Sequence, residues 1–156
     1  LTPSVYRLVK KTGYPGMKVL QFAFDSREES NYLPHNYTEN CIVYTGTHDN
    51  DTTLGWYKTF ARNDRKFADR YLNIQKDIKE KDIPWIFIRA AYSSVSRLAV
   101  IPMQDILSLG NEARMNRPST LGNNWQWRMK KGAFTKTLKK KTFDMAKLYS
   151  REMKAK

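Results

Sequence analysis

The side chains best placed to do chemistry in this sequence are His48 and Asp49, which follow a short run of apolar and β-branched residues at 41–44. A neutral histidine can donate or accept a hydrogen bond, and an aspartate can face a developing positive charge. A buried strand that ends abruptly in such a pair is how an α/β barrel presents catalytic side chains at its mouth. Asp51 and Thr52 come next and can cap a helix.

Two further apolar segments end in polar residues in the same way. The segment 18–24 ends at Asp25, and the segment 98–103 ends at a glutamine and Asp105. With a third strand at 41–47, these segments alternate with helical patterns, which predicts an α/β fold with a parallel sheet. Because side chains at the carboxyl ends of parallel strands converge, we expect these strand ends to meet at one site.

Helical patterns fill most of the sequence between the strands. The first helix is predicted to begin near Thr2 and Pro3, to present an apolar face, and to end at Gly13. A long irregular loop is predicted over 109–124, where glycine, asparagine and proline are frequent. Further helices are predicted after Thr52 to residue 60, over 61–81, from Ile83 to Ala91, and over 130–156 as a basic amphipathic helix.

Size and composition favour one globular unit over residues 1–156, with 40% hydrophobic and 13% aromatic residues. This length is too short for a whole (β/α)₈ barrel, which needs roughly 250 residues. The one cysteine excludes an internal disulfide and favours a cytoplasmic location. No apolar run has the ~18 residues of a membrane span, and neither metal-ligand spacing nor a cofactor-binding loop is visible, so we expect no metal and no cofactor.

The positive charge of the chain is concentrated after residue 60. The net charge is +13; residues 1–60 hold six basic and six acidic side chains, and residues 61–156 hold the remaining 22 basic and nine acidic ones. A basic nucleic-acid-binding module is therefore an alternative function. Against it, the most specific motifs lie in the neutral part, and lysines between apolar positions are typical of a solvated helix face, so we expect no nucleic-acid partner.

Several motifs, in the same order along the chain, are similar to those of the amylomaltases, or 4-α-glucanotransferases, of the α-amylase clan. These motifs are residues 15–24, 32–37, 44–53, 110–119 and 124–128. The resemblance covers nearly the whole chain and is weakest over 61–81 and in the tail. It implies a (β/α)₈ barrel that transfers α-1,4-glucan segments between maltooligosaccharides with retention, using three acidic residues.

The resemblance also implies roles for particular residues. Asp49 is implied as the third carboxylate, which stabilises the transition state, and His48 as its partner that hydrogen-bonds a sugar hydroxyl. Further substrate contacts are implied for Asp25, His35, Asn36 and Asn116. Two alternatives stay open from the residues themselves: Asp25 can be a turn residue, and residues 35–36 can make hydrogen bonds only within their own loop.

By the same resemblance, the strands at 18–24, 41–47 and 98–103 are the sixth, seventh and eighth of the barrel, so the chain is expected to be its carboxy-terminal part with flanking helices. The nucleophile and the acid/base of the family follow the fourth and fifth strands, and neither is found here. We therefore expect a chain that is inactive alone and whose partners are maltooligosaccharides and the remainder of the enzyme. A non-catalytic sugar-binding fragment is a further alternative.

Overall fold

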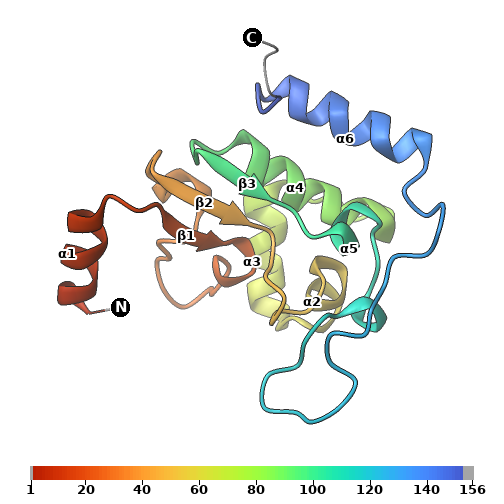
Figure 1. Ribbon diagram of the computed structural model, residues 1–156, viewed down its shortest axis with the longest axis horizontal. Helices are drawn as coiled ribbons and strands as arrows, with labels where there is room; N and C mark the ends of the chain where they lie inside the picture. The colour runs from red at the N-terminus through yellow and green to blue at the C-terminus, as the bar shows by residue number, and fades with distance from the viewer. Residues whose placement is uncertain (1, 153–156) are drawn as a thin grey trace.

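A three-stranded parallel sheet lies at the centre of the computed structural model, which describes residues 2–152. Its strands, β1 (Gly16–Val19), β2 (Cys41–Tyr44) and β3 (Leu98–Val100), lie side by side in that order (Figure 1). Gly16 pairs with Cys41, and Ile42 pairs with Leu98. The carboxyl ends of the three strands therefore meet at one edge, which confirms the predicted α/β fold with a parallel sheet.

The described residues also form six α-helices, and hydroxyl caps fix where two of them begin. The Thr52 hydroxyl accepts a hydrogen bond from the Gly55 amide, and the Thr135 hydroxyl accepts one from the Leu138 amide. The helices are α1 (Pro3–Thr12), α2 (Thr53–Thr59), α3 (Arg62–Leu72), α4 (Ile83–Ser93), α5 (Met103–Ile106) and α6 (Lys136–Leu148). Single 3₁₀ turns occur at Leu20–Phe22, Pro34–Asn36, Glu80–Asp82 and Asn111–Ala113.

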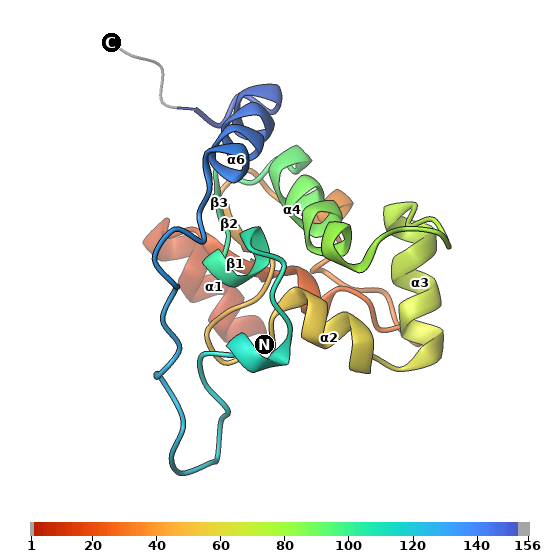
Figure 2. The same cartoon turned by 90° about the vertical axis from the view of Figure 1, so that its right-hand side faces the viewer.

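The main core lies between one face of the sheet and helices α2, α3 and α4, which Figure 2 shows on the same side of the strands. Phe24 is fully buried at its centre, and its ring meets the rings of Trp56 and Phe87 at centroid distances of 6.2 and 5.8 Å. A second cluster docks α6 on α4 through Met145 and Trp85. Burial of these aromatic side chains is the main force that holds the helices to the sheet.

The opposite face of the sheet is largely uncovered. Met17, Leu98 and Val100 on this face are 58%, 50% and 38% exposed. Parallel sheets are usually covered on both faces, so this open apolar face is unusual. Helix α1 does not cover it, because α1 has no buried residue and its apolar side chains Val5 and Leu8 remain exposed.

All three strands are shorter than the sequence pattern predicts. The segment 18–24 leaves the sheet after Val19 because the buried residues Leu20, Ala23 and Phe24 follow the spacing of a helical turn, which points them into the core. The segment 41–47 ends at Tyr44, where the chain turns toward a tight loop. The segment 98–103 ends early because Pro102 has no N–H to pair, and α5 begins immediately after it.

Two predicted helices also have corrected bounds. The helix expected over 61–81 ends at Leu72, because Asn73 takes a left-handed backbone with a φ of 54°. The basic helix expected over 130–156 begins only at Lys136, since Gly132 is left-handed and Thr135 caps the first turn. Residues 153–156 of that prediction lie outside the described residues. Between residues 2 and 152, none of the helices is long and apolar enough to cross a membrane.

Candidate active site

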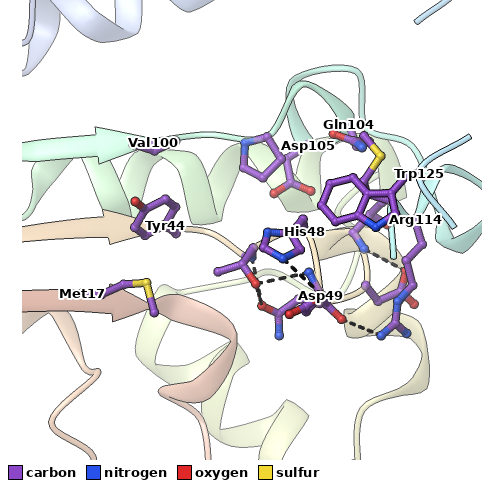
Figure 3. A pocket seen from close by; sticks show the side chains of 16 residues that line it. Met17, Tyr44, His48, Asp49, Val100, Gln104, Asp105, Arg114 and Trp125 are labelled. Atoms are coloured by element: carbon purple, nitrogen blue, oxygen red, sulfur yellow. Dashed lines mark hydrogen bonds and ion pairs between the residues drawn. The ribbon is translucent and has the colours of Figure 1, made fainter. Parts of the chain in front are cut away.

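A hollow of about 500 Å³ opens at the carboxyl edge of the sheet, on its uncovered face. Strand side chains form its floor and loop side chains form its mouth (Figure 3). The floor includes Met17, Tyr44 and Val100, and the mouth includes His48, Asp49 and Trp125. The hollow therefore combines an apolar surface with a few polar groups, which is the usual composition of a small-molecule site.

The loop that carries His48 and Asp49 is shaped by its own side chains. The carboxamide oxygen Oδ1 of Asn50 accepts hydrogen bonds from the amide of Thr47, at 2.9 Å, and from its hydroxyl, at 2.8 Å. These bonds close a tight turn directly after β2. The cap at Thr52 then begins α2, so the two candidate residues lie between two fixed points.

The carboxylate of Asp49 has one engaged oxygen and one free oxygen. Its Oδ1 accepts a hydrogen bond from Nδ2 of Asn116 at 2.7 Å, and Nε2 of His48 lies 3.3 Å from the same oxygen. No residue within 2–152 donates a hydrogen bond to Oδ2. The side chains of Asp49 and His48 are 49% and 55% exposed, so both are accessible to a ligand.

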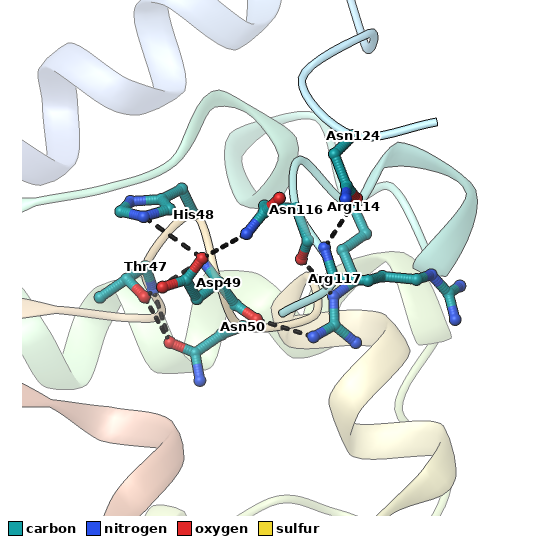
Figure 4. Close-up of polar contacts among 8 residues, drawn as sticks. All are labelled: Thr47, His48, Asp49, Asn50, Arg114, Asn116, Arg117 and Asn124. Carbon is teal, nitrogen blue, oxygen red and sulfur yellow. Dashed lines mark hydrogen bonds and ion pairs between the residues drawn. The ribbon is translucent and has the colours of Figure 1, made fainter. Parts of the chain in front are cut away.

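A second loop, which follows β3 and α5, is held by hydrogen bonds to the loop that carries His48 and Asp49 (Figure 4). The amide of Asn116 donates to the His48 carbonyl at 3.1 Å, and the guanidinium of Arg114 donates to the Asp49 carbonyl at 2.7 Å. The ring of Trp125 lies on the His48 imidazole, with ring centroids 4.9 Å apart. The site is therefore assembled from two loops that are far apart in the sequence.

Trp125 has a left-handed backbone, with a φ of 62°. This conformation costs a non-glycine residue roughly 1–2 kcal/mol. The amide of Trp125 donates to the Met115 carbonyl at 2.7 Å, and the Arg128 guanidinium donates to the Trp125 carbonyl at 2.8 Å, so hydrogen bonds on both sides hold it. Such strain is found where a side chain must be held at a particular place.

Asp105 supports the site from below, as a carboxylate that is only 1% exposed. Its oxygens accept hydrogen bonds from the hydroxyls of Thr45, at 2.5 Å, and Thr53, at 2.7 Å, and from the Thr53 amide at 2.8 Å. It thereby joins the end of β2 to the start of α2 and to α5. Burial raises the pKa of Asp105, and the three donated hydrogen bonds oppose that shift.

Asp49 is the one carboxylate of the hollow that keeps a free oxygen within the described chain. Asp51 also lines the hollow, but its two oxygens accept hydrogen bonds from the Thr52 amide, at 2.8 Å, and from Nδ2 of Asn111, at 2.7 Å. Asp105 is buried, and both of its carboxylate oxygens already accept hydrogen bonds from Thr45 and Thr53. The arrangement can therefore offer a ligand one carboxylate oxygen, one imidazole and one indole face.

The predicted site residues do not all come together. Asn116 joins His48 and Asp49, and Asp105 lies beneath them, but Asp25 does not line the hollow. Instead, Asp25 forms a two-point ion pair with Arg27, at 2.6 and 2.8 Å. Hydrogen bonds from Arg27 lower the pKa of the Asp25 carboxyl to about 2.

His35 and Asn36 lie in a 3₁₀ turn outside the hollow. Nδ1 of His35 lies 2.9 Å from the Tyr71 hydroxyl, on α3, and Nδ2 of Asn36 donates to the Ser30 carbonyl at 3.1 Å. Asn36 thus makes a hydrogen bond within its own loop, as the alternative interpretation expects, whereas His35 contacts helix α3.

Sequence reasoning gave too little weight to Trp125 and Arg114, which both line the hollow. Trp125 is 54% exposed, and its ring lies on that of His48. The signal that could have found both residues is their place in the two motifs that also hold Asn116 and Asn124.

No group of three or more potential metal ligands occurs in the part of the chain that the structure describes.

Comparison with known proteins gives consistent matches. A family model described as 4-alpha-glucanotransferase matches residues 1–135. The chain is 45% identical to a 4-alpha-glucanotransferase of Clostridium butyricum over 152 residues, 97% of this chain and 31% of that protein. It is 50% identical to one from Thermus thermophilus over 136 residues, 85% of this chain and 27% of that protein.

Solved structures give the same match. An amylomaltase from Streptococcus agalactiae, in complex with acarbose, superposes with a TM-score of 0.90 and 36% identity. The superposition covers 98% of this chain and 30% of that one. The chain thus spans about a third of the length of the relatives it matches.

Proposed function

The chain belongs to the 4-α-glucanotransferase family, and we propose that it forms part of an enzyme that transfers α-1,4-glucan segments between maltooligosaccharides with retention. The observation that carries this proposal is the Asp49 carboxylate, which is held by Asn116 through one oxygen and keeps the other free in the hollow. Family membership supports the reaction class, and this geometry supports the part in it that we propose for Asp49.

In retaining transfer, the sugar passes through a transition state that resembles an oxocarbenium ion. The free oxygen of Asp49 can accept hydrogen bonds from ring hydroxyls, and these bonds strengthen as positive charge develops on the ring. His48 can hydrogen-bond a neighbouring hydroxyl through its imidazole. The indole of Trp125 gives His48 a fixed support and offers an apolar surface to the sugar.

Retaining transfer also needs two further carboxyl groups about 5–5.5 Å apart, a nucleophile and an acid/base. Since Asp49 alone among the three carboxylates of the hollow has a free oxygen, we infer that both other groups come from the remainder of the enzyme chain. The residues described here then supply the third carboxylate and part of the cleft, and this chain by itself transfers no glucan.

We further infer that β1, β2 and β3 are the sixth, seventh and eighth strands of a (β/α)₈ barrel, in its carboxy-terminal part. The parallel order and the His-Asp pair in the loop after β2 support this placement. Sequencing the gene on both sides tests it. We expect the gene to encode a carboxylate nucleophile and an acid/base upstream of residue 1. If it encodes these two groups only downstream of residue 156, the placement is wrong.

Asp25, His35 and Asn36 are proposed as contacts to a longer glucan, away from Asp49. Asp25 follows the carboxyl end of β1 by six residues, which supports this proposal. A cytoplasmic location is also proposed. The one cysteine, Cys41, which is buried and free, supports a reducing compartment.

An NMR titration of the chain with maltotriose tests the proposed function, with cellotriose as the control of opposite linkage. Maltotriose is expected to bind, cellotriose to bind much more weakly, and Asp49→Asn to weaken maltotriose binding at least tenfold. Asp64→Asn, which removes a partly exposed carboxylate outside the hollow, is the matched control. Equal binding of both sugars, or no effect of Asp49→Asn, would overturn the sugar-binding role.

A product assay tests the division of labour between this chain and the rest of the enzyme. Incubation of the chain alone with maltotriose is expected to give neither glucose nor longer oligosaccharides, because losing members of a cooperating catalytic set costs several orders of magnitude in rate. Products that disappear in Asp49→Asn would show that a second carboxylate of this chain attacks the sugar.

A further inference from the structure

We infer that Arg114 is a positioning residue, whose guanidinium fixes Asp49 by joining the backbone of the two loops. Nη2 of Arg114 donates to the Asp49 carbonyl at 2.7 Å, and Nε donates to the Asn116 carbonyl at 2.9 Å. Asn116 in turn donates from its side chain to Oδ1 of Asp49, at 2.7 Å. Arg114, Asn116 and Asp49 thus form a closed ring of hydrogen bonds (Figure 4).

The guanidinium of arginine is well suited to this pair of contacts. Its guanidinium is planar and always charged, and it holds several N–H donors in a fixed fork. The two carbonyls at 49 and 116 accept from different nitrogens of that fork. A lysine keeps the charge, but its single nitrogen lacks the fixed second donor, and a glutamine loses the charge as well.

The loop that carries Arg114 depends on such contacts because it has little other support. Between residues 110 and 125, Ala113 is the one side chain that is buried, and the one regular element is the turn Asn111–Ala113. A segment with few buried apolar contacts opens easily. The contacts made by Arg114 therefore decide where Asn116 and Trp125 lie, and through them how Asp49 and His48 are presented.

The consequence for the site follows from Asp49. With Oδ1 held by Asn116, the carboxylate cannot rotate freely, and Oδ2 stays available to the hollow. A group that is already oriented before the ligand arrives costs less to order on binding. This role rests on the proposed sugar-binding function, but its structural part can be tested without any sugar.

The test compares Arg114→Gln with Arg117→Gln by NMR. Both variants remove one positive charge from the same loop. The Arg117 side chain donates to Asn111 and, within the described residues, makes no hydrogen bond to Asp49 or Asn116. In Arg114→Gln, the Asn116 amide is expected to exchange with solvent at least tenfold faster. The His48 ring signals are expected to lose the shift that the Trp125 ring causes. Arg117→Gln is expected to leave both signals as they are in the wild type.

The chain contains an internal reference for this measurement. It has two histidines, and His35 lies against Tyr71, away from the hollow. The His35 signals are therefore expected to stay constant in both variants, which shows that the fold persists. Arg114→Lys separates charge from geometry, since we expect it to behave like Arg114→Gln.

Maltotriose affinity completes the test, with at least a tenfold loss expected in Arg114→Gln and less than a twofold loss in Arg117→Gln. Unchanged Asn116 exchange and His48 signals in Arg114→Gln overturn the positioning role, whether or not the sugar binds. Altered signals with unchanged affinity overturn it too, because the fixed geometry would then not matter for binding. Failure of the wild type to bind maltotriose refutes the proposed function alone.

Discussion

The ionisation of Asp105 is affected by the fold, because its carboxylate is buried beneath the loop that carries Asp49. Its folded-state pKa is raised above the ordinary value of 3.8, so the folded chain binds this proton more tightly than the unfolded chain does. The stability that this group contributes is therefore full below pH 3.8 and is lost as the pH rises through the folded-state pKa.

Urea unfolding from pH 3.5 to 7, with wild type and Asp105→Asn, measures this contribution. The free energy of unfolding of the wild type, relative to the variant, is expected to decrease as the pH rises. Asp64→Asn is the control of opposite sign, because hydrogen bonds from Ser26 lower the pKa of Asp64, and its contribution is lost as the pH falls. If the free energy of unfolding of the wild type, relative to that of Asp105→Asn, increases as the pH rises, the pKa of Asp105 is not raised by folding.

Asp25 gives a second prediction at this scale. Because Asp25 lies outside the hollow, Asp25→Asn is expected to leave maltotriose affinity unchanged and to weaken maltohexaose binding about threefold to tenfold, the loss of about one hydrogen bond. Calorimetric titration of both sugars measures this, with Glu28→Gln in the same loop as control. Wild-type affinity for both sugars would mean that Asp25 serves only its ion pair with Arg27.

At the scale of elements, the start of α2 links helix stability to the site. Thr52→Ala removes the cap of α2, and Thr135→Ala removes the equivalent cap of α6. Each substitution is expected to lower the free energy of unfolding by about 1 kcal/mol. Only Thr52→Ala is expected to weaken maltotriose binding as well, because α2 begins directly after the loop of the site. Thermal unfolding and the NMR titration measure the two effects; equal losses of affinity in both variants contradict this link.

The same elements show what the sequence could predict. The cap at Thr52 is a local signal, so the start of α2 was predicted correctly. The His-Asp pair after a β-branched run is a local signal too, and its role in the site stays a prediction. The turn Leu20–Phe22 was expected to be strand because its residues favour strands; packing of Phe24 against α3 and α4 overrides that preference. The contact between Arg114 and Asp49 joins residues 65 positions apart, and no local pattern contains it.

At the scale of the whole molecule, the chain exposes more surface than its mass requires. Its accessible surface is 10939 Å², whereas a compact monomer of 18.3 kDa is expected to expose about 8,100 Å². The open face of the sheet contributes to the difference, and β1 and β3 each leave one edge without a neighbouring strand in the described sheet. Exposed apolar faces and free strand edges favour association.

We therefore expect the chain to self-associate as its concentration rises, which sedimentation equilibrium measures. Leu98→Lys places a charge on the open face and is expected to weaken association at least tenfold. Leu121→Lys makes the same chemical change at the tip of the loop after β3, where the side chain is already fully exposed, and is expected to have little effect. A monomeric wild type, or equal effects of both variants, contradicts this expectation.

The hydrogen bonds between the loop that carries Asp49 and the loop that carries Arg114 also affect how the molecule responds to heat. The bonds that hold the site join residues 60 to 67 positions apart and lie at the exposed rim, whereas the sheet is held by a buried aromatic core. Rim contacts of this kind open at a lower free energy than core contacts. On warming, the pocket comes apart while the sheet is still intact, so the temperature limit for sugar binding lies below the melting temperature of the fold.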